Sequence, residues 1–116
     1  MNLRITHLLS ATLAEFLILT AGCKSHHVEI TVENRTGGPV RLLEVDYPSA
    51  SFGADAVEPG QVVRSSIQVQ GTGPVKVLYT APDQHQAQIT GPNLVEKQEG
   101  KLAIVLLPGD KADFNQ

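Results

Sequence analysis

Short runs in which apolar and polar residues alternate constrain the fold of this chain most strongly. In residues 28–34, Val28, Ile30 and Val32 alternate with polar residues, which makes one face of an extended strand apolar. Similar alternation recurs over residues 40–47, 62–70, 75–80 and 85–89. Successive side chains of a strand point to opposite faces, whereas a helix needs a period near 3.6. No helical period of useful length follows Cys23, so the sequence predicts an all-β domain.

The composition favours a small sandwich of two sheets over residues 27–116. Val, Leu and Ile must form the core because the chain has three Phe, two Tyr and no Trp. Pro59-Gly60 and Pro108-Gly109 suit type II turns, and residues 71–74 are expected to connect a hairpin. About six to eight strands, spaced by about 10–12 residues, predict an antiparallel β-sandwich that is Ig-like in general character. A small barrel is the alternative architecture.

Residues 1–22 follow a different pattern from the rest of the chain. Arg4 precedes an apolar stretch over residues 8–19, which ends in the small residues 20–22. Positive charge, an apolar run and small residues, in that order, are typical of a secretory signal peptide. The run is also shorter than the about 20 apolar residues of a membrane-spanning helix. We therefore expect an N-terminal signal helix before the folded domain.

The end of this segment, Ala21-Gly22-Cys23, resembles the lipobox of bacterial lipoproteins. In that family, signal peptidase II cleaves before a cysteine that has received a diacylglyceryl group. Two positions depart from the family pattern: Thr20 stands where Leu is commonest, and Glu15 interrupts the apolar run. The resemblance implies cleavage between Gly22 and Cys23 and a membrane anchor of acyl chains, such as palmitate, on Cys23. We expect no cofactor other than this covalent lipid.

The alternative is an ordinary signal peptide that leaves Cys23 as a free thiol, although an unpaired thiol in a secreted protein is open to oxidation. In the lipoprotein interpretation, residues 23–26 form a short tether, since only Lys24, Ser25 and His26 separate the cysteine from the first strand pattern. Four extended residues span at most about 13–14 Å, so the domain should lie close to the membrane. By resemblance to other lipoproteins, Lys24 after the cysteine favours the outer membrane, with the domain facing the periplasm.

The sequence contains few residues in patterns that indicate a catalytic site or a metal site. There is no G-x-S-x-G motif, which is the sequence signature of a serine nucleophile elbow. The only Met is residue 1 and the only Cys is residue 23, which excludes a blue-copper site. The nearly balanced charge, a net −3 with no basic cluster, excludes a nucleic-acid footprint. We therefore expect a non-enzymatic binding or structural protein of the envelope, with the membrane and an envelope protein as partners. The alternative function is binding of Zn²⁺ or Cu²⁺ by His26, His27 and His85 in the periplasm.

The connection over residues 48–58 is the first candidate surface for a partner. It is long for a small sandwich, and such loops are often functional. Its candidate binding residues are Tyr47, Phe52 and Asp55. Alternatively, Phe52 folds back over the core, or residues 52–57 form a short edge strand, because a domain with so few aromatic residues seldom leaves one exposed.

The outer face of the predicted sandwich is the second candidate surface. Leu42, Leu78 and alternate residues of 102–107 point away from the predicted core. If their strands are neighbours, these side chains form an exposed apolar stripe for a partner or a membrane. Alternatively, residues 102–107 form a central strand whose outer face is covered by a loop.

Overall fold

The computed structural model describes residues 26–116. The predicted signal helix, the cleavage site at Gly22 and Cys23 and the beginning of the tether lie outside the described residues. No helix within residues 26–116 is long and apolar enough to cross a membrane. The strands are β1 (Val28–Asn34), β2 (Val40–Tyr47), β3 (Ala50–Val57), β4 (Val62–Ile67), β5 (Gly73–Thr80), β6 (Gln86–Leu94), β7 (Gly100–Leu107) and β8 (Lys111–Asn115).

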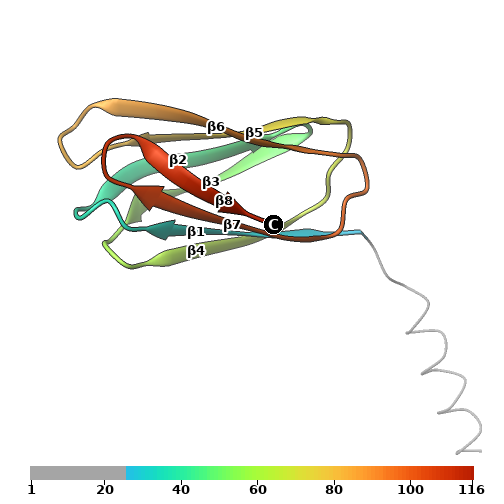
Figure 1. Ribbon diagram of the computed structural model, residues 1–116, viewed down its shortest axis with the longest axis horizontal. Helices are drawn as coiled ribbons and strands as arrows, with labels where there is room; N and C mark the ends of the chain where they lie inside the picture. The colour runs from blue at the N-terminus through green and yellow to red at the C-terminus, as the bar shows by residue number, and fades with distance from the viewer. Residues whose placement is uncertain (1–25) are drawn as a thin grey trace, which may run out of the picture.

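The eight strands form two sheets that pack face to face (Figure 1). One sheet has the strand order β4-β1-β7-β8, and the other has the order β3-β2-β5-β6. Neighbouring strands are antiparallel except β1 and β7, which run parallel. The predicted all-β sandwich is therefore confirmed, with one parallel pair inside it. Residues 71–74 lead from β4 in one sheet to β5 in the other, so the hairpin predicted there is wrong.

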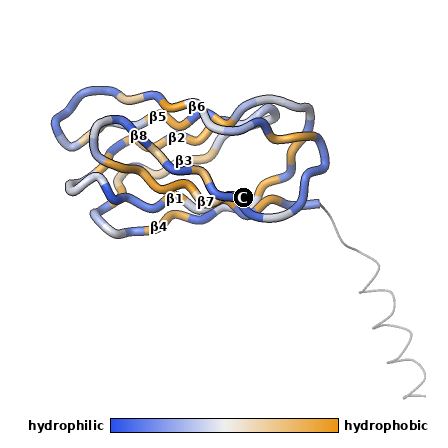
Figure 2. The backbone as a smooth tube through the Cα atoms, in the orientation of Figure 1, coloured by the Kyte–Doolittle hydropathy of each residue, from blue (hydrophilic) through white to orange (hydrophobic). Residues whose placement is uncertain are grey.

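The predicted apolar faces form the core between the two sheets. Val28, Ile30 and Val32 of β1 are fully buried, as are Val45 of β2 and Val77 of β5. Hydrophobic residues follow the strands, and most of the connecting turns are hydrophilic (Figure 2). Removing such a side chain from water is worth roughly 1.5–3 kcal/mol, so this aliphatic layer is the main force that holds the sheets together.

Residues 50–57 form strand β3, which pairs with β2 at the edge of its sheet. The loop predicted over residues 48–58 is therefore wrong, and the alternative of an edge strand is confirmed. Phe52 lies opposite Val45 in the β2–β3 pair and packs against the core, partly buried. Only residues 48 and 49 remain as the turn between the two strands.

Asn34, the last residue of β1, is the buried polar residue of this core. Its side-chain amide donates to the carbonyl oxygens of Gly38, at 2.8 Å, and Val57, at 2.9 Å. Its side-chain oxygen accepts from the backbone N–H of Thr36, at 3.0 Å, and from the Thr36 hydroxyl, at 2.7 Å. These four bonds join the end of β1, the following turn and the end of β3, and so connect the two sheets.

The turns that connect the strands lie at the two ends of the sandwich (Figure 1). The N-terminal end, where β1 begins, carries the turns before β3, β5 and β7. The far end, where β1 finishes, carries the turns before β2, β4, β6 and β8. This assignment follows from the strand pairing, because β1 and β7 begin together while β4 and β8 run in the opposite direction.

Candidate functional site

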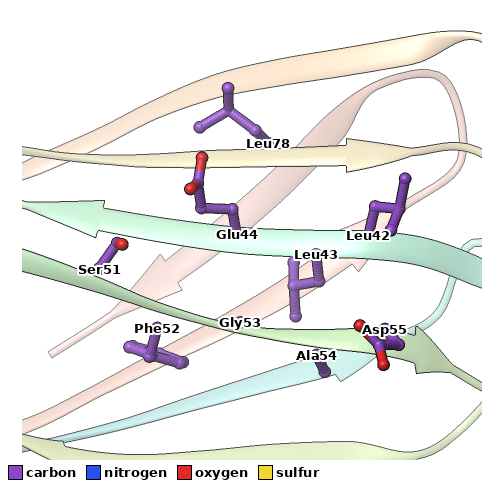
Figure 3. Close-up of a pocket in the computed structure, with 9 residues that line it drawn as sticks. All are labelled: Leu42, Leu43, Glu44, Ser51, Phe52, Gly53, Ala54, Asp55 and Leu78. Atoms are coloured by element: carbon purple, nitrogen blue, oxygen red, sulfur yellow. The ribbon is translucent and has the colours of Figure 1, made fainter.

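A shallow, open depression of about 720 Å³ lies on the sheet that contains β2, β3 and β5 (Figure 3). Figure 3 shows that Leu42, Glu44 and Leu78 project to one side of this sheet, whereas Leu43 and Phe52 project to the other side. The lining residues are Leu42, Leu43, Glu44, Ser51, Phe52, Gly53, Ala54, Asp55 and Leu78.

A β-bulge in β2 shapes this depression. The pairing of β2 with β5 shifts between Arg41 and Glu44, and Leu42 inside the bulge has a φ of 50°. A left-handed backbone costs roughly 1–2 kcal/mol for a residue with a Cβ atom. Leu42 is nevertheless 66% exposed, more than any other large apolar residue in the described part of the chain. Gly53 on β3 accommodates the bulge, because a Cβ atom there would collide with the carbonyl oxygen of Leu43.

The depression combines an apolar centre with negative charge. Leu42 is exposed and Leu78 half-buried, and they project from the same side of neighbouring strands. Glu44 and Asp55 are exposed, and no lysine or arginine is among the lining residues. This arrangement suits an apolar side chain that lies next to a lysine or arginine.

The predicted partner-binding residues do not share one face. Tyr47 and Phe52 are partly buried against the core, whereas Asp55 is exposed. Phe52 and Asp55 both line the depression, but Tyr47 lines a separate hollow at the N-terminal end, next to Pro48. The interpretation that Phe52 folds onto the core is confirmed. The adjacent Leu42 and Leu43 interrupt the alternation over residues 40–47, because Val40 and Leu43 both face the core although they are three residues apart. This interruption is the sequence signal of the bulge.

The predicted apolar stripe is only partly present. Leu42 and Leu78 lie on neighbouring strands, as the stripe requires. Residues 102–107, however, belong to β7, which is a central strand of the other sheet. The outward-facing residues Val105 and Leu107 are half-buried, so they do not extend the surface around Leu42.

The three histidines considered as metal ligands lie at opposite ends of the sandwich. His26 pairs with Glu99 through an Nδ1 to Oε1 distance of 2.9 Å at the N-terminal end. His27 is next to it, and its carbonyl oxygen accepts from the backbone N–H of Gly100. His85 lies in the β5–β6 turn at the far end. These three side chains therefore do not form one metal site, and residues 26–116 contain no other group of three suitable ligands.

His85 instead joins two carboxylates at the far end. Its Nδ1 contacts Asp83 in the same turn, and its Nε2 lies 2.7 Å and 2.8 Å from the two carboxylate oxygens of Asp110 in the β7–β8 turn. The bond to Asp110, followed by that to Asp83, raises the pKa of His85. The backbone N–H of His85 is the main cause of the lowered pKa of Asp83. The cluster thus links the turns of two different sheets.

A pocket of about 220 Å³ lies between these two turns. Tyr79, His85 and Asp110 are among its lining residues. The hydroxyl of Tyr79 is buried and has no hydrogen-bond partner within residues 26–116. Burial, and to a smaller extent the charge of Asp110, raises the pKa of Tyr79. Of the residues in this cluster, the sequence pattern indicates only His85 as a candidate ligand. Asp83 is close to His85 in the sequence, whereas Asp110 is 25 residues away.

Comparison with known proteins supports the fold and does not extend to function. No protein-family profile matches the sequence, and no curated protein matches it. The chain is similar to a solved structure described as the NMR structure of the protein from Eubacterium rectale. The two have a TM-score of 0.56 and 14% identity, over 78% of this chain and 87% of the other. At this identity the likeness shows the fold alone.

Proposed function

We propose that this chain is a lipid-anchored, non-enzymatic binding protein of the bacterial cell envelope. The observation that carries the proposal is the lipobox-like Ala21-Gly22-Cys23, which is separated by only four residues from the start of β1 at Val28. Each acyl CH₂ buried in a membrane contributes about 0.8 kcal/mol, so the two or three chains of a mature lipoprotein give a stable anchor. The short tether holds the N-terminal end of the sandwich near the lipid.

The depression around Leu42 is the surface that we assign to a protein partner. Residues held in unfavourable backbone conformations often belong to functional sites, and Leu42 combines such a conformation with high exposure. Glu44 and Asp55 favour a partner segment with an apolar residue next to a lysine or arginine. A sugar ligand is a poorer match, because the one aromatic residue of the lining, Phe52, packs against the core.

Replacement of the cysteine tests the anchor. Cys23→Ala should abolish lipidation, which mass spectrometry would detect as loss of the acyl groups, and should release the protein from the membrane fraction. Ser25→Ala is the matched control, since it alters the tether without touching the attachment site. An unchanged mass and unchanged membrane retention of Cys23→Ala would exclude the lipoprotein function.

Crosslinking in intact cells tests the binding surface. Leu42→Asn suits the left-handed backbone better than leucine does, so it should keep the thermal stability while it removes the apolar contact. We expect the crosslinked partner to be lost with Leu42→Asn and with Asp55→Lys. Val95→Asn, at an exposed site outside the depression, is the control. Equal crosslinking yields for wild type, Leu42→Asn and Asp55→Lys would show that the partner binds elsewhere.

A further inference from the structure

The far-end pocket has a feature that the depression around Leu42 lacks, which is a buried polar atom without a partner. Tyr79 is only 3% exposed, and its hydroxyl forms no hydrogen bond with the described part of the chain. A buried hydroxyl without a hydrogen-bond partner is energetically unfavourable, and such groups are rare in folded proteins. The hydroxyl therefore points to a partner that is not part of residues 26–116.

The charges around this pocket indicate the sign of that partner. Asp83 and Asp110 face the imidazole of His85, so the cluster has a net charge of −1 when His85 is protonated and −2 when it is neutral. Both carboxylate oxygens of Asp110 approach the same imidazole nitrogen, and each oxygen keeps a further lone pair. The carboxylate side chain is also 43% exposed, so a cation from solvent can approach it and compete with His85.

We propose that this pocket binds an alkylammonium group, such as the end of a lysine side chain, with the Asp110 carboxylate and the Tyr79 hydroxyl as its hydrogen-bond acceptors. An ammonium group has three N–H donors and no acceptor, which matches these two oxygens. The volume of about 220 Å³ corresponds to about seven water molecules, enough for the ammonium and a short alkyl chain. Pro82, Leu107 and Pro108 supply apolar walls for that chain.

In the absence of the ligand, the imidazole of His85 lies at Asp110, where the ammonium group would bind. Its Nε2 contacts Asp110, and the Tyr79 hydroxyl is closed to solvent in this conformation. The ligand therefore replaces His85 at Asp110, and the half-exposed imidazole moves toward solvent. Because only the protonated imidazole competes well for Asp110, the ligand binds more tightly as the pH rises and His85 loses its proton. Binding in turn lowers the pKa of His85.

Titration of the purified full chain with n-butylammonium tests this inference. Calorimetry at a series of pH values from about 6 to about 9 follows binding as His85 loses its proton, while most of the amine, whose pKa is near that of lysine at about 10.4, stays charged. We expect one saturable site per chain with a lower Kd at the higher pH. Asp110→Asn should weaken binding at least about tenfold, and Tyr79→Phe about fivefold. Asp113→Asn removes an exposed carboxylate of β8, outside the pocket, and should change the Kd less than about twofold.

The imidazole NMR signal of His85, assigned by comparison with His85→Gln, gives a second readout. Addition of n-butylammonium should shift its titration curve to lower pH, which a merely structural role of the cluster would not produce. Absence of saturable binding would overturn the proposal, and so would equal affinity of wild type and Asp110→Asn. Equal binding of n-butanol would show an apolar hollow in place of a cation site. These results are independent of Cys23 and of the surface around Leu42.

Discussion

Replacement of Asn34 by alanine should be the most damaging polar substitution in the described domain. The side chain is fully buried and makes four hydrogen bonds, with Gly38, Val57 and two groups of Thr36. A hydrogen bond contributes about 0.5–1.5 kcal/mol net, and buried groups that lose their partner cost more. We therefore expect Asn34→Ala to lower the free energy of unfolding by about 2–4 kcal/mol. This is a large part of the roughly 5–15 kcal/mol typical of a small domain.

Urea unfolding followed by circular dichroism measures this loss directly. The midpoint should fall while the slope m stays constant, because the exposed surface on unfolding hardly changes. For a domain of this size, about 1 kcal/mol corresponds to about 4–8 °C, so the melting temperature should drop by about 8 °C or more. Asn93→Ala, at an exposed position of β6, is the control and should stay within about 0.5 kcal/mol of wild type.

Asn34→Asp separates the two halves of the hydrogen-bond network. The aspartate keeps an acceptor for Thr36 but loses the amide that donates to Gly38 and Val57. It also places a carboxylate against two carbonyl oxygens, so the variant should be less stable at neutral pH than at a pH near 4. If the free energy of unfolding of Asn34→Ala is less than about 0.5 kcal/mol below that of wild type, the two sheets are not joined through this side chain, and the reasoning is refuted.

Three further predictions concern packing and pH. Gly91→Ala should destabilise the domain, because a Cβ atom would collide with the ring of Phe114; in a double-mutant cycle with Phe114→Ala the two effects should be strongly non-additive. Phe52→Ala should lower the melting temperature, since Phe52 packs against the core, and an unchanged value would contradict that placement. His85→Gln should reduce the free energy of unfolding at about pH 5.5 but hardly at about pH 9. The pKa of His85 is raised in the folded state, so the stabilisation by its protonated form is complete below about pH 6.5 and disappears as the pH rises through the folded-state pKa. A constant difference between the urea midpoints of the two proteins would contradict this.

Strands with one buried face could be predicted from the sequence, whereas the edge strand β3 could be predicted only as an alternative to a loop. Val28, Ile30 and Val32 alternate because one side of β1 meets the other sheet while its opposite side faces away from the core. In β3 the alternation is weak, since an edge strand built from small residues contributes mainly backbone pairing with β2. Backbone hydrogen bonds between strands do not require apolar side chains at alternate positions, so they produce no hydrophobic pattern in the sequence.

The candidate sites depend on relations that a linear pattern does not record. Leu42 acquires its left-handed backbone from a register shift between β2 and β5, and a pair of leucines that interrupts the alternation does not specify such a shift. Asp110 meets His85 because the β5–β6 and β7–β8 turns come together at the far end, although 25 residues separate them. The buried hydroxyl of Tyr79 likewise becomes evident only from the fold, in which it has no hydrogen-bond partner within residues 26–116.

Both candidate sites carry negative charge, and part of the depression lies near the far end of the domain. Leu42 is near the start of β2 and Asp55 near the end of β3, and these positions adjoin the far end that holds Asp110. In the proposed lipoprotein, the N-terminal end faces the lipid, and a seven-residue strand such as β1 spans about 23 Å. Leu42, Asp55 and Asp110 then lie toward the end of the domain that is away from the membrane, where a single basic partner can reach them. Because the contacts at their exposed carboxylates are screened by salt, capture of that partner should weaken as the ionic strength rises above about 0.1 M.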